Sequence, residues 1–318
     1  MTYLVATDEA GYGPNLGPLV ISASVWEVPD GVGSGDLYRL LEPAVAPRPD
    51  GRRRVAMADS KILYSSGKGL ALLERGLWAA WGLLGLRPRT CAEVWDVLAD
   101  GSIQARRMAA SEDCEAMPLP RDADLAEYET LQPILRQTMA AAGVRLLGLR
   151  SRAIFPDEFN RTIAKCGSKG LALSRWTLGL VERTIRPLRT AAVSILCDKH
   201  GGRDRYLPLL MECFEGEMIV FRAEGRLQSI YRFGPPQCPV EFCFQAKAES
   251  HLPAALASMA SKYLRELAMH ALNAFWTARL PGLRPTAGYP QDALRFKAEI
   301  AATQRLLKID DQILWRVK

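Results

Sequence analysis

Near the N-terminus stands the stretch Asp8-Glu9-Ala10-Gly11-Tyr12-Gly13-Pro14-Asn15-Leu16-Gly17-Pro18-Leu19-Val20. Apolar runs precede it at residues 3–6 and follow it at residues 19–25, so the pattern predicts two strands with the acids and glycines in the turn between them. Adjacent carboxylates in such a turn have two interpretations. One is a solvated turn, where Asp and Gly are common. The other is a site for a hard cation such as Mg²⁺ or Mn²⁺, which takes oxygen ligands.

Two later segments also place an acid at the end of an apolar run. Residues 191–197 are typical of a buried strand that stops at Asp198. Residues 241–246 predict another strand, which leads to Glu249 just before a long amphipathic helix. Capping of that helix by a carboxylate explains Glu249 as well as a metal site does. Acids at the ends of several strands converge on one rim of an α/β sheet, so we expect these acids to lie near Asp8-Glu9.

The length and composition of the chain bound its organisation. The 318 residues, 48% of them hydrophobic, are enough for a substantial core. We expect one domain over residues 1–318 with a C-terminal helical extension. Residues 85–143, with scattered acids and prolines, predict an insertion or lid. Residues 201–238 predict a second insertion that contains a hairpin at 218–223 and 229–233. The net charge of +6 is compatible with an anionic partner.

The cysteine content and the apolar runs indicate in which cellular compartment the protein is expected. Seven cysteines form an odd set without a C-x-x-C pair, so neither a zinc site nor a disulfide framework is indicated, and free thiols in a reducing compartment are expected. No basic segment opens the chain as in a signal peptide, and no apolar run approaches the roughly 20 residues of a membrane span. We therefore expect a soluble cytoplasmic protein with no membrane partner, and a monomer.

Motifs in a fixed order resemble a known family. The opening stretch is similar to D-E-A-G-R-G-P-x-x-G-P-V-V, the signature of type 2 ribonucleases H (ribonuclease HII/HIII). Asp59-Ser60-Lys61 resembles the family's D-S-K, and Gly288-Tyr289-Pro290 resembles its G-Y-[GP] loop. Lys247-Ala248-Glu249 and the helix after it resemble K-A-D…A-A-S-I-x-A-K…R-D. The match covers the segments 1–26, 55–84, 144–200 and 239–300.

The resemblance implies an α/β, RNase H-like fold: a mixed central sheet flanked by helices, with insertions. It also implies a metal-dependent endoribonuclease that binds RNA–DNA hybrids and hydrolyses the RNA strand, leaving 5′-phosphate and 3′-hydroxyl ends. Two Mg²⁺ or Mn²⁺ ions would be bound with the substrate. The implied catalytic and metal-binding residues are Asp8, Glu9, Asp198 and Glu249. The implied substrate-binding residues are Gly11, Tyr12, Gly13, Lys61, Lys247 and Tyr289.

Two positions depart from the family pattern. Tyr12 replaces an Arg and so removes a fixed cation with several donors, which leaves open the preference between single embedded ribonucleotides and long hybrids. Glu249 replaces an Asp; its extra methylene still reaches a metal but leaves the preferred ion open. Two alternatives follow. One is a nucleic-acid-binding relative with weak or no catalysis, and the other is a nuclease for a different nucleic acid.

Overall fold

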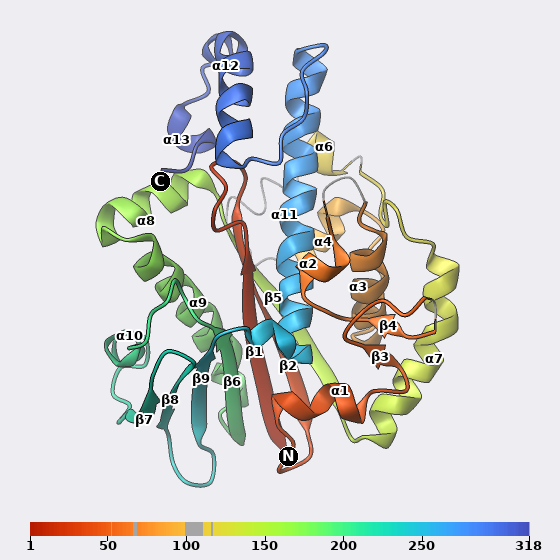
Figure 1. Cartoon of the computed structure of the whole chain (residues 1–318), viewed down its shortest axis with the longest axis vertical. Coiled ribbons are helices and arrows are strands. Elements are labelled where there is room, and N and C mark those ends of the chain that lie inside the picture. The colour runs from red at the N-terminus through yellow and green to blue at the C-terminus, as the bar shows by residue number, and fades with distance from the viewer. Residues whose placement is uncertain (52, 66–68, 99–110, 116, 318) are drawn as a thin grey trace.

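The computed structural model describes residues 1–51, 53–65, 69–98, 111–115 and 117–317. Within these residues, seven strands form one mixed sheet in the order β5-β2-β1-β6-β9-β8-β7 (Figure 1). They are β1 (Thr2–Ala10), β2 (Leu19–Val28), β5 (Arg145–Ile154), β6 (Ala192–Asp198), β7 (Val220–Glu224), β8 (Gln228–Phe233) and β9 (Val240–Gln245). A separate parallel pair consists of β3 (Val45–Ala46) and β4 (Val55–Ala56).

Strand direction changes across the central sheet. β1 pairs antiparallel with β2 and parallel with β6, and β9 continues the parallel part. β5 runs antiparallel to β2 at one edge, and the β7–β8 hairpin completes the other edge in antiparallel pairing. The expected α/β fold, a mixed central sheet flanked by helices, is confirmed. The predicted hairpin within residues 201–238 is the β7–β8 pair.

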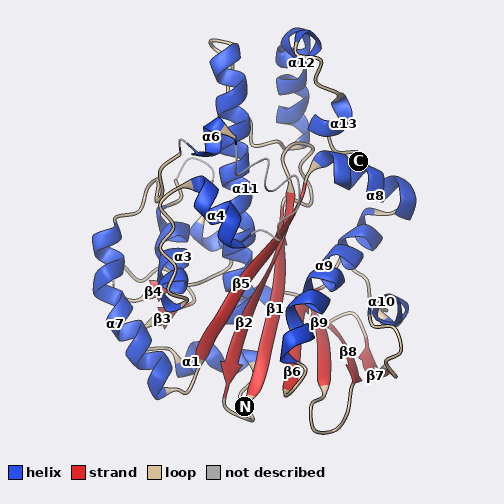
Figure 2. Cartoon of the chain, turned by 180° about the vertical axis from the view of Figure 1, so that it is seen from behind, coloured by secondary structure: helices blue, strands red, loops and turns tan. Residues whose placement is uncertain are grey.

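Helices cover both faces of the sheet (Figures 1 and 2). They are α1 (Leu37–Leu40), α2 (Ser60–Leu63), α3 (Ala71–Leu83), α4 (Cys91–Leu98), α6 (Glu112–Glu115), α7 (Leu125–Ala141), α8 (Pro156–Cys166), α9 (Lys169–Ile185), α10 (Leu207–Cys213), α11 (Leu252–Arg279), α12 (Pro290–Leu306) and α13 (Asp311–Leu314). Three short 3-10 helices are η1 (Ser34–Asp36), η2 (Arg186–Leu188) and η3 (Ala248–Ser250). None of the helices in the described ranges is long and apolar enough to span a bilayer.

The two faces have separate hydrophobic cores because side chains alternate along a strand. Val20 of β2 packs with Leu256 and Met259 of α11. Its neighbour Ile21 packs with Trp176 of α9 on the other face. The apolar face predicted for α11 is buried, and the helix contacts β1, β2 and α3. The central helix is therefore held on several sides.

The first strand is longer than the sequence pattern indicates. β1 continues through Asp8 and Glu9 to Ala10, with Asp8 opposite Ser22 of β2. The prediction that both acids lie in the turn is therefore wrong. The cause is the ladder with β2, which continues past the apolar run because neighbouring strands supply the hydrogen bonds whatever the side chains are.

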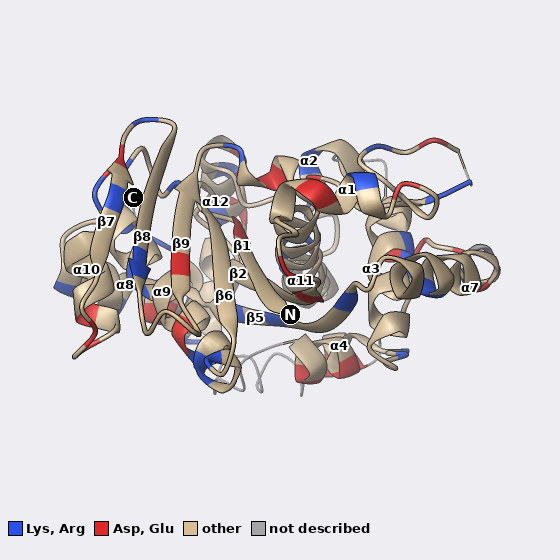
Figure 3. Ribbon diagram, turned by 90° about the horizontal axis from the view of Figure 1, so that it is seen from below, with Lys and Arg blue, Asp and Glu red and all other residues tan. Residues whose placement is uncertain are grey.

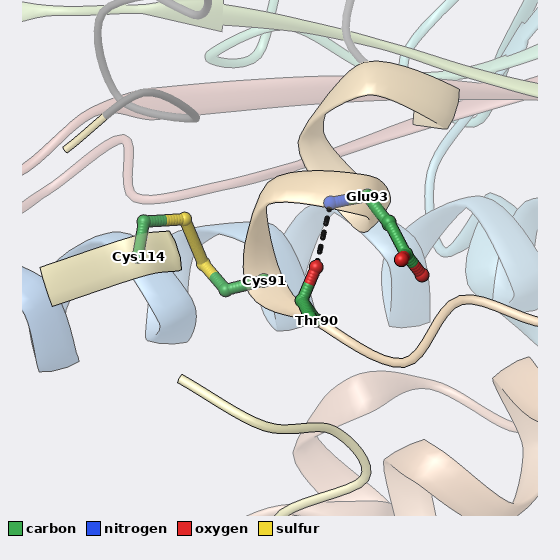
Figure 4. Close-up of a disulfide and its surroundings, with 4 residues drawn as sticks. All are labelled: Thr90, Cys91, Glu93 and Cys114. Carbon is green, nitrogen blue, oxygen red and sulfur yellow. Dashed lines mark hydrogen bonds between the residues drawn. A yellow bond between two sulfur atoms is a disulfide. The ribbon is translucent and has the colours of Figure 1, made fainter. Parts of the chain in front are cut away.

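Cys91 and Cys114 form a disulfide, as Figure 4 shows, so the prediction of free thiols is wrong for this pair. Both sulfurs are buried, and the bond links the start of α4 to α6. Beside it, Thr90 Oγ1 accepts a hydrogen bond from the Glu93 amide at 3.2 Å. The other five cysteines are free thiols: Cys166, Cys197, Cys213, Cys238 and Cys243.

The described helices of residues 85–143 pack onto the body of the protein. α7 contacts α3, and α4 contacts β5. Residues 99–110 and 116 of this region lie outside the described residues. That residues 85–143 and 201–238 are insertions stays a prediction.

Candidate active site

The backbone brings the predicted acids to one rim of the sheet. β1 and β6 are parallel neighbours whose last registered pair is Thr7 with Cys197, so Asp8 and Asp198 follow side by side. β9 pairs its last residue, Gln245, with Asp198, and the chain then turns into η3, which carries Glu249. The Ala248 amide donates to Asp198 Oδ1 at 3.3 Å. The turn after β9 is thus tied directly to the end of β6.

Lys61 is the cation among these acids. Its Nζ lies 3.9 Å from Glu249 Oε1 and 3.9 Å from Asp59 Oδ2. Asp59 also caps α2, since its Oδ1 accepts from the Lys61 amide at 3.1 Å. Partial burial lowers the pKa of Lys61, but the charges of Asp59, Glu249, Asp8 and Asp198 raise it above its ordinary value. The ammonium group therefore stays charged and partly offsets the acids.

The acids themselves are poorly compensated. Burial raises the pKa of Asp8 well above its ordinary value, and the charge of Glu9 raises it further. Burial, followed by the charge of Asp198, raises the pKa of Glu9 to about 7. Burial also raises the pKa of Asp198. Glu249 Oε2 is buried without a hydrogen-bond partner among the described residues. The Asp8, Glu9 and Asp198 carboxyl groups therefore resist ionisation unless a cation joins them.

A divalent cation fits the chemistry of this donor set. The four acids offer only oxygen ligands, which Mg²⁺ and Mn²⁺ prefer, and the unpartnered Glu249 oxygen is available to one. In the part of the chain that the structure describes, however, no three His, Cys, Asp or Glu side chains are already arranged to hold a metal ion.

Two serines of α11 form hydrogen bonds with Asp8. The Ser258 hydroxyl hydrogen-bonds the Asp8 carboxylate and lies 3.0 Å from Ser60 Oγ. Ser261 Oγ lies 2.9 Å from the Asp8 carbonyl oxygen and 2.8 Å from Ser22 Oγ. The sequence analysis gave these serines no role. The available signal was two hydroxyls three residues apart in the otherwise apolar first part of the helix, residues 252–261, which places both on one face.

A cleft of about 330 Å³ opens beside Glu9. The predicted site residues that line it are Glu9, Gly11, Lys61 and Tyr289. Lining residues without a predicted role include Tyr64, Lys262, Arg265 and Glu266. The cleft thus combines cations and aromatic rings next to the acids.

Glu266 organises one wall of the cleft. Its Oε1 accepts from Lys262 Nζ at 2.6 Å and from Arg265 Nη1 at 3.1 Å, and its Oε2 accepts from the Tyr64 hydroxyl at 2.8 Å. Burial raises the pKa of Glu266, but the charge of Lys262 and these hydrogen bonds outweigh it and lower the pKa overall. Lys262 Nζ also lies 4.2 Å from the centroid of the Tyr64 ring. The wall is therefore a charged, hydrogen-bonded network in which Arg265 Nε is buried without a partner among the described residues.

Arg265 joins the glycine-rich turn to the loop that carries Tyr289. Gly11 has a φ of +88°, and a Cβ built there would come within 2.6 Å of the Pro18 carbonyl oxygen and 2.7 Å of Arg265 Cδ. Only glycine fits such a position. Arg265 Nη2 donates to the Ala287 carbonyl at 2.9 Å, and its guanidinium lies 6.0 Å from the Tyr289 ring centroid.

Three predicted substrate-binding residues lie outside this cleft lining. Tyr12 is half-buried against the core on the α9 side, and burial followed by the charge of Glu9 raises its pKa. Gly13 is exposed, and no atom lies within 4 Å of a Cβ built on it. Lys247 is exposed with a φ of 62°. The roles given to all three stay predictions.

Comparisons with known proteins find distant structural similarity. No protein-family model and no curated protein sequence matches the chain. Ribonuclease H2 from Pyrococcus horikoshii OT3 is 14% identical with a TM-score of 0.43, covering 98% of this chain and 92% of the other. The PCNA:RNase HII complex from Archaeoglobus fulgidus contains a chain 13% identical with a TM-score of 0.41, covering 100% and 94%. Bst-RNase HIII in complex with Mn²⁺ is 14% identical with a TM-score of 0.39, covering 99% and 66%.

Proposed function

We propose that this chain is a metal-dependent endoribonuclease that hydrolyses the RNA strand of RNA–DNA hybrids. The observation that carries the proposal is the convergence of four acids from β1, β6 and η3 around Lys61. The poor compensation of these acids supports it, since buried structural acids are normally satisfied by hydrogen bonds. The order of sequence motifs that resemble type 2 ribonucleases H supports the choice of substrate.

In this proposal Asp8, Glu9, Asp198 and Glu249 hold Mg²⁺ or Mn²⁺. When bound there, the ions would supply activation of a water and stabilisation of the leaving 3′ oxygen, consistent with 5′-phosphate and 3′-hydroxyl ends. Ser258 orients the Asp8 carboxylate through its hydroxyl. The exposed ammonium group of Lys61 contacts a phosphate next to the acids, which is the role that a flexible point charge performs well.

The cleft is proposed to receive the nucleotides beside the scissile phosphate. Gly11 lets the backbone approach the sugar closely, and recognition of RNA rests on the 2′-hydroxyl. Tyr289, which is 54% exposed, offers a ring for stacking on a sugar or base. Arg265 and the Glu266 network fix the walls around them.

Cleavage of end-labelled substrates tests the proposal. The panel is a long RNA–DNA hybrid, a DNA duplex with one ribonucleotide and an all-DNA duplex, each with Mg²⁺ or Mn²⁺. We expect cutting of the RNA strand, with Asp8→Asn at least about 100-fold slower, since loss of mere outer-shell support already costs 10–100-fold. The matched control is Asp30→Asn, because Asp30 is exposed and pairs only with Thr2 and the N-terminal amine. It should cut like the wild type.

The same panel separates the alternatives. Folded protein that binds the hybrid but cuts nothing with either ion would establish a catalytically silent binder. Preferential cutting of the all-DNA duplex would establish a different nuclease.

A further inference from the structure

The turn between β7 and β8 lies at the rim of the candidate active site. In register, Asp198 of β6 faces Gln245 of β9, and Gln245 faces Gln228, the first residue of β8. The turn before Gln228 therefore projects from the same end of the sheet as the acids. Two hydrogen bonds fix this placement: Lys199 Nζ donates to the Gly225 carbonyl, and the Ala246 amide donates to the Leu227 carbonyl at 3.0 Å.

These contacts place the turn against residues that directly adjoin functional positions. Lys199 follows Asp198 in the chain, and Ala246 precedes Lys247. Lys199 is almost completely buried, and its ammonium group is held by Asp204 Oδ1 at 2.6 Å as well as by the turn. Its charge is therefore used inside the protein, where it positions the hairpin.

The base of the hairpin is rigid. The Tyr231 hydroxyl donates to Glu224 Oε1 at 2.6 Å and accepts from the Tyr206 amide at 2.8 Å. Ser229 Oγ donates to the Asp204 carbonyl at 2.6 Å. The turn is thus presented in one conformation, and presenting it this way costs little ordering entropy on binding.

The tip of the turn carries exposed side chains. Arg226 is exposed, and Leu227 is 77% exposed. Lys247, on the adjoining segment, is exposed as well. No described residue forms an ion pair with Arg226 or Lys247, whereas nearby Glu224 is already engaged by Tyr231 and Arg205. Figure 3 shows further basic residues along β7 and β8, away from the central strands.

We propose that the β7–β8 turn extends the nucleic-acid-binding surface, with Arg226 and Lys247 contacting phosphates of the strand that leads away from the acids. This inference rests on the proposed function and adds, at Arg226, a substrate contact outside the segments that resemble a known family. Unpaired cations beside a phosphodiester site suit backbone contacts, which position a nucleic acid without reading its sequence. Leu227 then lies against a sugar or base.

Binding of a fluorescently labelled RNA–DNA hybrid tests the proposal by anisotropy over a range of salt, with Ca²⁺ in place of Mg²⁺. Arg226→Ala should weaken binding about 3- to 10-fold and lower the slope of log K against log salt by roughly one. Arg226→Lys should restore most of both. The matched control is Arg150→Ala, an exposed arginine on β5 at the opposite edge of the sheet, which should bind like the wild type.

The outcomes separate the two proposals. If the wild type cleaves and binds the hybrid while Arg226→Ala keeps its affinity and salt slope, the turn is no part of the surface and the proposed function stands. If the wild type binds no hybrid, the proposed function and this inference fall together. Equal weakening by Arg150→Ala would show a general charge effect and would also overturn the inference. Thermal unfolding of each variant verifies that the exposed substitutions leave the fold intact.

Discussion

Glu74 and the acids of the candidate site are both buried near α11, but their carboxylates differ in how far hydrogen bonds satisfy them. Glu74 of α3 is completely buried, and each of its oxygens accepts two hydrogen bonds. Oε1 accepts from the Tyr263 hydroxyl at 2.8 Å and the Arg121 amide at 2.7 Å. Oε2 accepts from the Asp122 and Ala123 amides at 2.8 and 2.9 Å. Glu74 therefore has a structural role: its hydrogen bonds link α3 to α11 and to the segment before α7.

The acids of the candidate site are not satisfied to this extent, although Ser258 hydrogen-bonds the Asp8 carboxylate and the Ala248 amide donates to Asp198 Oδ1. Asp8 and Glu9 repel each other and have raised pKa values, and Glu249 keeps a buried oxygen without a partner among the described residues. The difference teaches that burial alone does not mark a functional acid. A buried acid with satisfied oxygens stabilises the fold, whereas several unsatisfied acids in one place lower stability until something binds them.

The largest effect on stability is expected at Glu74. Glu74→Ala removes the acceptor of three partly buried backbone amides and of the buried Tyr263 hydroxyl. We expect the free energy of unfolding to fall by about 3–5 kcal/mol, measured by urea denaturation. Glu74→Gln, which keeps an acceptor oxygen, should lose less. Cleavage per folded molecule should not change.

An unchanged urea midpoint in Glu74→Ala would break the comparison, because it would mean that the hydrogen bonds of Glu74 contribute nothing to the fold. Loss of cleavage in a variant that is still fully folded would also contradict it, since Glu74 would then act on the site.

The acids at the strand ends can be predicted from the sequence because the pattern that marks them lies within one short segment. An apolar strand that runs into Asp198 is visible in one short segment, and so is the Asp8-Glu9 pair. The amphipathic pattern of α11 is equally local, since helix period alone specifies its buried face. These features needed no knowledge of distant contacts.

The rest depends on partners far away in the chain. Glu74 sits within an amphipathic helix, and its amide partners come from residues 121–123, so no local pattern marks it as buried. The Cys91–Cys114 pair has no diagnostic spacing. The Arg265 contact with the Ala287 carbonyl likewise appears only once the loop has folded back onto α11.

A smaller effect, with a definite dependence on pH, is expected at Glu9. The folded protein raises the pKa of Glu9 from its ordinary 4.5 to about 7, so the folded chain holds the proton more tightly than the unfolded chain does. In metal-free protein, the stability that Glu9 contributes is therefore fully present below about pH 4.5 and is lost as the pH rises to about 7. Glu9→Gln should remove this loss and be more stable than the wild type by about 1–2 kcal/mol at pH 8, with no gain at pH 4.5.

Thermal unfolding at several pH values without divalent ions measures this difference. Added Mg²⁺ should stabilise the wild type at pH 8 more than at pH 5, because ionised carboxylates bind the ion. A wild type that grows more stable between pH 5 and 7, relative to Glu9→Gln, would show that Glu9 is compensated like Glu74.

The smallest effect is expected at Ser258, whose hydroxyl contacts the Asp8 carboxylate but is not itself a proposed metal ligand. Its hydroxyl hydrogen bond lowers the pKa of Asp8, against the larger effect of burial. Ser258→Ala should cost about 1 kcal/mol of stability and move the acidic limb of the cleavage profile to higher pH, because Asp8 then ionises less readily. Ser250→Ala, at an exposed serine near the start of α11, is the control and should leave the profile in place. A loss of stability without any shift of the profile would assign Ser258 to packing with Ser60, as a structural residue like Glu74.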